Sequence, residues 1–296
     1  ATNKQFSAFY NNTVITGRTG ATAGDLELND LLTMLLCIND PSLHICRKLY
    51  RWFVYYEIDA ATEANVIAPL AQIFRTNNYE IKPVLEALLK SEHFFDVLNQ
   101  GCLIKSPVDI LVGTCREFGV VFPDATTDYV GAYNMWLILS QLSFTFQQYI
   151  GDPPNVAGWP AYYQQPQFYE IWINSDTFPK RNQFTDVMLT SGFTRSGKKI
   201  VIDPTIFAKS LPNPGDPNAL ISDSVTYLFR LPLLQASKDQ LKRDVLLGGQ
   251  TSDFYWTNAW TAWIANPNDT VNANIVKTKL KDLYMYLLKL AEYQLA

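Results

Sequence analysis

The chain has 296 residues, of which 48% are hydrophobic and 18% charged, and it carries a formal net charge of -4. This composition excludes a disordered tail and predicts a folded protein with a sizeable core. The basic residues are scattered rather than gathered in a stripe, so nucleic acid is not expected as a partner. Every apolar run is interrupted before the roughly 18 residues that a membrane-spanning helix needs, so no membrane span is expected.

The cysteines and the N-terminus say little about the cellular compartment. No CxxC pair occurs, and each cysteine lies in an apolar helical context, which favours core thiols and leaves a disulfide open. The four are Cys37, Cys46, Cys102 and Cys115. Residues 1–6 have no basic leader followed by an apolar block, so any signal peptide has been removed or lies upstream.

Leucine spacing and a turn signal predict a helical hairpin near the N-terminus. The first helix runs from about Leu26 to Cys37, with leucines at three-to-four spacing along one face. Asp40-Pro41 then caps and opens a second helix, which is expected to direct Trp52 and Phe53 into the core together with Ile45 and Leu49.

Prolines position the next three helices, because proline suits the first turn of a helix and interrupts its interior. These helices are expected over 66–74, kinked or split at Pro69, from Pro83 onward, and over 107–119. The segment 128–149 is apolar on nearly all sides and predicts a helix buried centrally in the fold. Residues 151–174 combine prolines and glycines with large aromatic residues and predict a long, ordered loop.

The remaining chain is again mainly helical. Helices are expected from 175, over 219–230, over 237–247 after a Ser237 capping box, from Asp253, and over 270–295. A polar connection at 191–218 separates the first two of these, and its residues 191–202 suit a small β-hairpin. The fold class is therefore predicted to be all-α, an irregular multi-helix array with a long aromatic, proline-rich loop. Residues 1–296 are expected to form one helical domain, which divides, if at all, into two lobes near 191–218.

Signatures of catalysis and of cofactor binding are missing from the sequence. Its two histidines, His44 and His93, form no HExxH pattern, and no GxSxG, GxxxxGK[ST] or GxGxxG motif occurs. His44 is expected to pack among helices rather than to bind a metal. We therefore expect no cofactor and no metal site, and an enzyme without a known motif stays open.

The aromatic loop at 151–174 carries the one specific chemical suggestion. Trp159, Tyr162 and Trp172 offer flat apolar faces, and Asn155 and Asn174 offer amide groups, a combination that suits a saccharide. The same stretch holds Tyr163, Gln164, Gln165, Gln167 and Tyr169. The favoured alternative is that the rings plug the loop onto the core, because a large exposed aromatic cluster is costly. In that case Trp159→Ala is expected to cost about 3 to 5 kcal/mol of stability.

Several motifs resemble the bacterial domain-of-unknown-function 1800 (DUF1800) family. They are His44 with Arg47-Lys48-Leu49 and Trp52-Phe53-Val54, Leu88-Leu89 with Ser91 and Phe94, Lys105-Ser106-Pro107 with Asp109 and Arg116, Pro153 to Pro160, Trp172-Ile173-Asn174-Ser175 with Arg181, and Glu292-Tyr293-Gln294-Leu295. Asp109 stands where glutamate is commoner in the family. The resemblance spans nearly the whole chain and corresponds to the C-terminal portion of a typical member, whose N-terminal region contains a Trp-His-bearing helix.

The resemblance implies an exported bacterial protein, in the periplasm or at the cell surface, with a protein partner in the envelope. It implies no known reaction. Its polar motif residues are candidates for a functional site: His44, Arg47, Lys48, Lys105, Asp109 and Arg116. The binding candidates of the loop and its surroundings are Asn155, Trp159, Tyr162, Trp172, Asn174 and Arg181.

The polar motif residues also suit a structural role, which we favour over substrate binding. Lys105 before a helix start requires a compensating acid such as Asp109 or Glu117, so a buried ion pair is expected. Arg47 and Arg181 can clamp carbonyls or carboxylates and tie the proline-rich loop to the helices.

Three functional hypotheses therefore stay open. The first is a binding or assembly component of the envelope, the second a saccharide-binding protein that uses the 151–174 loop. The third is an enzyme whose site needs the N-terminal half of the family domain.

Overall fold

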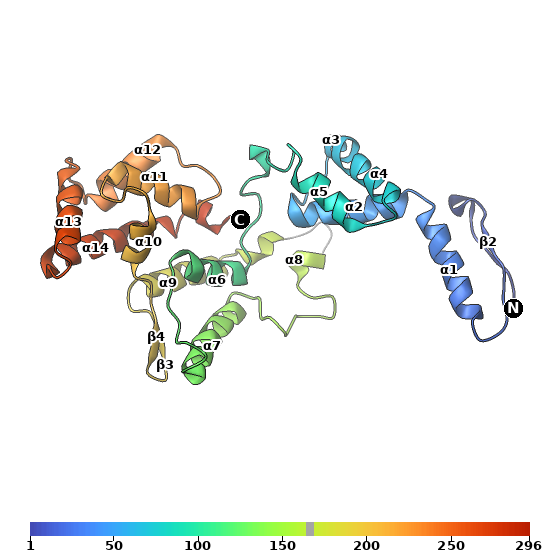
Figure 1. Cartoon of the computed structure of the whole chain (residues 1–296), viewed down its shortest axis with the longest axis horizontal. Helices are drawn as coiled ribbons and strands as arrows, with labels where there is room; N and C mark the ends of the chain where they lie inside the picture. The colour runs from blue at the N-terminus through green and yellow to red at the C-terminus, as the bar shows by residue number, and fades with distance from the viewer. Residues whose placement is uncertain (164–168) are drawn as a thin grey trace. The chain divides into compact units, whose positions relative to one another are not determined.

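The computed structural model describes residues 1–163 and 169–296, and almost all of its regular structure is helical (Figure 1). The all-α prediction is confirmed. The chain groups into two compact units, residues 1–99 and 100–296. The segment 191–218, given as the boundary if the domain divides into two lobes, lies inside the second unit, and the single domain stays a prediction.

The first unit contains one small hairpin and a series of short helices. In chain order they are β1 (Lys4–Gln5), η1 (Ala8–Tyr10), β2 (Val14–Ile15), α1 (Ala23–Leu36), α2 (Asp40–Phe53), α3 (Ala60–Thr62), η2 (Glu63–Ile67), α4 (Ala68–Thr76), α5 (Ile81–Leu89) and η3 (Val97–Asn99). β1 and β2 pair antiparallel, with Lys4 opposite Ile15. No hairpin was predicted there, since two-residue strands leave no alternation to detect.

The second unit continues with longer helices and a second hairpin. Its elements are α6 (Pro107–Glu117), α7 (Tyr129–Thr145), α8 (Pro160–Tyr163), η4 (Tyr169–Trp172), α9 (Thr177–Leu189), β3 (Phe193–Arg195), β4 (Lys198–Ile200), α10 (Pro204–Ser210), α11 (Pro217–Leu228), α12 (Gln235–Gln240), η5 (Leu241–Leu246), α13 (Phe254–Ala265), α14 (Thr270–Leu287) and η6 (Ala291–Gln294). The predicted hairpin is confirmed, with β3 and β4 antiparallel. Gly192 precedes it in a left-handed conformation, and a Cβ there would collide with the Ile200 carbonyl.

The interruption expected at Pro69 takes the form of a π-helical segment, η2. The Ala68 amide bonds to the Glu63 carbonyl, five residues back, directly before Pro69 in the first turn of α4. A proline has no N–H to offer to the preceding turn, and the wider turn absorbs that mismatch without ending the helix.

The core of the first unit lies between α2, α4 and α5, where Cys46, Tyr50, Phe74 and Leu88 are buried. The prediction that Trp52 points inward is wrong, because its side chain is 57% exposed. Ser42, Cys46 and Tyr50 share the buried side of α2, and a residue two positions after Tyr50 faces the opposite side of a helix. The same expectation is wrong for Phe53, which is 38% exposed, and the leucine face of α1 leaves Leu28, Leu32 and Leu36 exposed.

The central helix of the second unit is α14 rather than α7. α14 contacts α9, α10, α13 and η5, and it buries Val276, Leu280, Leu283, Tyr284 and Leu287. α7 buries one side, which includes Gly131, Ala132 and Met135, and leaves several aromatic residues exposed on the other. The prediction that α7 is central was therefore wrong. It rested on the apolar character of the whole segment, which does not show whether a neighbouring element covers each side of the helix.

All four cysteines are free thiols in the structure. Cys46 and Cys115 are buried, as expected of core thiols, whereas Cys37 is exposed and Cys102 half-buried. Within residues 1–163 and 169–296, no helix has both the length and the apolar character needed to cross a bilayer.

Candidate functional site

Motif segments far apart in the sequence meet in the second unit. The Lys105 amide donates to the Gln294 carbonyl at 2.8 Å, and the Ala296 amide donates to the Leu103 carbonyl at 2.8 Å. Ile104 and Leu295 form an isolated antiparallel bridge between these bonds. The chain end is therefore paired, strand to strand, with the residues that lead into α6.

The start of α6 is fixed by a capping box. Ser106 Oγ accepts from the Asp109 amide and the Asp109 carboxylate accepts from the Ser106 amide, each at 3.2 Å. Pro107 occupies the first helical position, where its missing N–H leaves no bond unmade. Asp109 therefore helps to cap the helix, and Lys105, which precedes the N-cap residue Ser106, is turned towards the core.

Lys105 is buried beside an acid and an aromatic ring. Its Nζ lies 3.9 Å from Glu117 Oε1 and 4.1 Å from the centroid of the Tyr293 ring. Burial lowers the pKa of Lys105, and the Glu117 carboxylate opposes that shift. The expected ion pair is thus confirmed, with Glu117 as the closest acid.

Tyr293 joins this pair to the rest of α6. Its hydroxyl donates to Glu117 Oε2 at 2.8 Å and lies 2.7 Å from Thr114 Oγ1. The side chain is fully buried, and burial, reinforced by the negative charge of Glu117, raises the pKa of Tyr293 well above its usual value. The phenol therefore stays neutral and serves as a hydrogen-bond donor.

Arg181 on α9 is fully buried and bonds mainly to neutral oxygens. One guanidinium nitrogen donates to the carbonyls of Lys105 at 3.0 Å and Trp172 at 3.1 Å, and another lies 3.4 Å from Gln294 Oε1. Burial lowers the pKa of Arg181 to about 10, and the charge of Asp109 opposes that shift. Its planar fork ties three chain segments together, as a clamp would.

The binding candidates of the aromatic loop lie in mixed environments. Trp172 is buried and its ring centroid lies 5.8 Å from that of the half-exposed Tyr162. Trp159 is half-buried, whereas Asn155 and Asn174 are exposed. Gln164, Gln165 and Gln167 lie outside the described residues, as do the side chains of Tyr163 and Tyr169.

The two asparagine amides mainly stabilise turns. Asn155 Oδ1 accepts from the Ala157 amide at 2.8 Å, and Asn174 Oδ1 accepts from the amides of Asp176 and Thr177 at 2.9 Å. Such bonds from a side chain to nearby backbone are the usual chemistry of asparagine in loops. Both acceptors are thus occupied by the protein's own backbone.

The other polar motif residues are spread over the surface. Arg47 on α2 binds Glu63 with two bonds of 3.0 and 2.6 Å, so this clamp holds η2 rather than the 153–160 loop. His44 and Lys48 on α2 are exposed, as is Arg116 on α6. The expectation that His44 packs among helices is therefore wrong, because its side chain is exposed.

An apolar groove between α6 and α7 is a feature that the sequence did not reveal. Its cavity volume is about 280 Å³. α6 contributes Val108, Leu111 and Val112, α7 contributes Trp136, Leu139, Ser140 and Ser143, and Ile150 follows α7. The Ser143 hydroxyl donates to the Ser140 carbonyl at 2.8 Å, so little polar capacity faces the groove.

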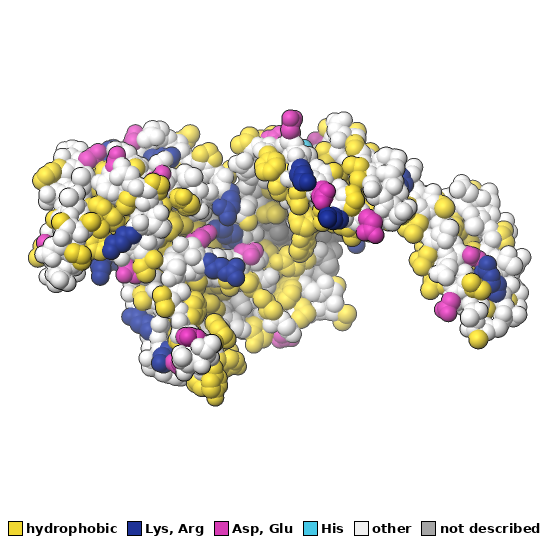
Figure 2. All heavy atoms as spheres, in the orientation of Figure 1, with side chains coloured by type: hydrophobic (Ala, Val, Ile, Leu, Met, Phe, Trp, Pro, Cys, Tyr) yellow, Lys and Arg dark blue, Asp and Glu magenta, His cyan; other side chains and the backbone are white. Residues whose placement is uncertain are grey.

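Exposed aromatic residues extend this groove along α7. Tyr129, Tyr133, Trp136 and Phe144 are 74%, 60%, 51% and 64% exposed. At 3.6 residues per turn they fall within about a quarter-turn of one another, on one side of the helix. Figure 2 shows hydrophobic side chains gathered where α7 lies in Figure 1.

A family model described as "Protein of unknown function (DUF1800)" matches residues 2–295. The chain belongs to the DUF1800 family. No curated protein and no solved structure matches it. The family assignment brings no reaction with it, so the function of this DUF1800 protein has to be argued from its own surface and cavities.

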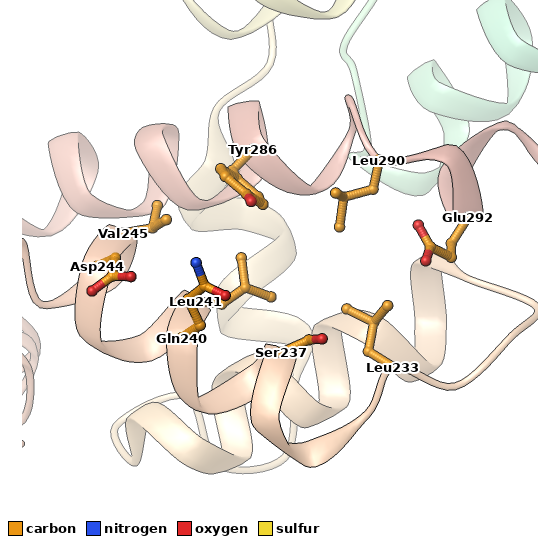
Figure 3. Close-up of a pocket in the computed structure, with 9 residues that line it drawn as sticks. All are labelled: Leu233, Ser237, Gln240, Leu241, Asp244, Val245, Tyr286, Leu290 and Glu292. Atoms are coloured by element: carbon orange, nitrogen blue, oxygen red, sulfur yellow. The ribbon is translucent and has the colours of Figure 1, made fainter.

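Figure 3 shows a second pocket of this DUF1800 protein, with a cavity volume of about 150 Å³. One wall is a continuous helical face of α12 and η5, which presents Ser237, Gln240, Leu241 and Asp244 at three-to-four spacing. Tyr286 of α14 lies opposite. Within the described parts of the chain, no group of three or more His, Cys, Asp or Glu side chains is placed to hold a metal ion.

Proposed function

We propose that this DUF1800 protein is a binding component that holds an apolar segment of a protein partner in the α6–α7 groove. One observation carries the proposal: a groove lined almost wholly by hydrophobic side chains continues into the exposed aromatic side of α7. Its export to the bacterial envelope, and a partner there, are further parts of the proposal that rest on the family resemblance.

The chemistry of the groove favours apolar side chains as its contents. No charged residue is among those that line it, and of its two serines Ser143 donates its hydroxyl proton to the backbone carbonyl of Ser140. A charged ligand would lose water there without gaining an oppositely charged partner, whereas an apolar side chain gains on transfer from water.

The extent of the aromatic side favours a protein rather than a small molecule. Tyr129 and Phe144 lie at opposite ends of α7, well beyond the groove itself, and both are largely exposed. Contiguous apolar surface of this kind marks protein interfaces, and buried tryptophan and tyrosine contribute most to their affinity.

The 151–174 loop supports a saccharide less well. Trp172 and Arg181 are buried, and the Asn155 and Asn174 amide oxygens accept backbone bonds. Among the loop side chains that the structure describes, Trp159 and Tyr162 are the partly exposed candidate rings, and the two candidate asparagines use their amide oxygens in turns.

The test compares two exposed tryptophans. Wild-type protein, Trp136→Ala and the matched control Trp52→Ala are used to retrieve proteins from the native envelope fraction, and each retained protein is quantified by mass spectrometry. We expect a stoichiometric partner with the wild type and the control, and at least about tenfold less of it with Trp136→Ala, since a central tryptophan contributes 2 kcal/mol or more.

Thermal unfolding of both variants serves as the control for folding. Trp136 and Trp52 are about equally exposed, so neither substitution should move the melting temperature by more than a few degrees. A partner that is retained equally by all three proteins would refute the groove as the binding surface.

A further inference from the structure

The pocket of Figure 3 has an apolar middle and a carboxylate at each end. Asp244 lies at one end and Glu292 at the other, with Leu241, Leu290 and Leu233 between them. The apolar middle suits a chain of methylene groups, which gain on transfer out of water. A volume of about 150 Å³ is below that of typical drug-sized sites, and suits a ligand the size of a single side chain.

The two carboxylates differ in how far the protein has already neutralised them. Asp244 accepts two bonds from Arg243, at 2.6 and 3.0 Å. The half-buried Glu292 carboxylate has no ion pair or side-chain bond among the interactions of the described residues, and no basic side chain is among those lining the pocket. Glu292 therefore leaves a net negative charge beside an apolar wall.

Polar side chains also line the pocket between the two carboxylates. The Tyr286 phenol and the Ser237 hydroxyl both face it in Figure 3, and Gln240 lies between them and Asp244. An ammonium group has three N–H donors and no acceptor, and a carboxylate is its strongest partner.

We propose that this pocket binds a primary alkylammonium group, with its alkyl chain along Leu233, Leu241 and Leu290 and its charge at Glu292. The same chemistry is presented by a free aliphatic amine and by a lysine side chain of another protein. The proposal is independent of the α6–α7 groove, which lies on other helices and carries no charged lining residue.

The test uses n-pentylamine as the probe and 1-pentanol as its uncharged match, each titrated into the whole chain at low salt and followed by ligand-observed NMR. A ligand of this size is expected to bind with a dissociation constant on the order of millimolar. Because a charge-assisted bond is lost in the alcohol, we expect pentanol to bind roughly tenfold more weakly. Equal binding of the two probes, or no binding of the amine, overturns the proposal.

Two glutamate variants locate the charge. Glu292→Gln keeps the shape of the side chain. It is expected to weaken the binding of pentylamine roughly tenfold and to leave the affinity for pentanol unchanged. Glu92→Gln, at an exposed glutamate of the first unit, is the matched control and should leave both titrations unchanged. Pentylamine affinity that survives Glu292→Gln, or that falls equally in the control, contradicts the assignment.

A peptide arm separates the two sources of the amine. Blocked Gly-Gly-Lys-Gly-Gly is compared with the same peptide carrying norleucine in place of lysine. Tighter binding of the lysine peptide than of pentylamine identifies a protein lysine as the natural ligand, and binding of the amine alone identifies a free amine. Trp136→Ala should leave every one of these titrations unchanged, so failure of the groove proposal and failure of this one are distinguishable.

Discussion

Arg47 on α2 and Arg181 on α9 carry the same guanidinium group in opposite environments. Arg47 is about one-third exposed and binds the Glu63 carboxylate with two bonds, whereas Arg181 is fully buried and bonds to the carbonyls of Lys105 and Trp172. A wet ion pair contributes little to stability, because water competes for both charges. A buried guanidinium is costly to desolvate, and removing it leaves a buried acceptor such as the Lys105 carbonyl without its donor.

The contrast extends to what each arginine connects. Arg47 joins α2 to the π-helical segment η2 through one carboxylate. Arg181 links the segment before α6, the segment before α9 and, through Gln294, the chain end. The first is therefore a local contact, and the second holds together residues that are 113 positions apart in the sequence.

The largest expected effect is that of removing Arg181. Arg181→Ala leaves the Lys105 carbonyl without its guanidinium donor, leaves the Trp172 carbonyl with the Thr177 hydroxyl alone, and opens an empty volume, so we expect a loss of about 3 to 5 kcal/mol in the free energy of unfolding. Arg181→Lys keeps the charge without the planar fork, so we expect this variant to fold with a smaller loss in the free energy of unfolding. Urea unfolding followed by circular dichroism measures both. A loss below about 1 kcal/mol in Arg181→Ala would show that the clamp is dispensable.

The next effect concerns Tyr293, whose pKa is raised by burial and by the charge of Glu117. The unfolded phenol ionises near pH 10 while the folded one stays protonated, so stability is full below pH 10 and falls as the pH rises above it. Between pH 8 and pH 11 ionisation of the unfolded phenol should therefore lower the free energy of unfolding, by on the order of 1 kcal/mol.

Tyr293→Phe isolates that contribution. The variant should be about 1 to 3 kcal/mol less stable at pH 8, because the Glu117 and Thr114 oxygens lose a partner. It should also lose less stability than the wild type between pH 8 and pH 11, as measured by urea unfolding at both values. Parallel curves for the two proteins would mean that the phenol ionises as readily in the folded state as in the unfolded one.

Sequence patterns predicted the features that are decided within a few residues. Pro107 and the Ser106–Asp109 capping box fix the start of α6, and the hairpin at 191–202 follows from its own turn residues. The capping box expected at Ser237 was wrong, since α12 begins at Gln235 and Ser237 lies inside it. Several residues near the first residue of a helix can match the same short capping signature. The sequence therefore predicts the presence of a helix better than the residue at which it begins.

Features that depend on distant neighbours could not be read from the sequence. The sequence offered two candidates for the acid beside Lys105, and Glu117 was one of them. The hydrogen bond from the Tyr293 hydroxyl to Glu117 joins residues 176 positions apart, and no local signal marks that contact. The α6–α7 groove was missed for the same reason. α7 is apolar on both sides, and only the placement of its neighbours decides that Met135 is buried and Trp136 exposed.

The smallest expected effect is that of the Arg47–Glu63 pair. Both side chains are about one-third exposed, so Arg47→Met and Glu63→Gln should each cost no more than about 1 kcal/mol at low salt. The double variant should cost less than the sum of the two, because either single substitution already removes the pair, and 1 M NaCl should shrink the difference further. Urea unfolding of the four proteins at two salt concentrations gives the coupling energy. A coupling as large as the loss in Arg181→Ala would mean that Arg47 owes its strength to its bidentate geometry rather than to burial, and the environment of a guanidinium would then no longer explain the difference between the two clamps.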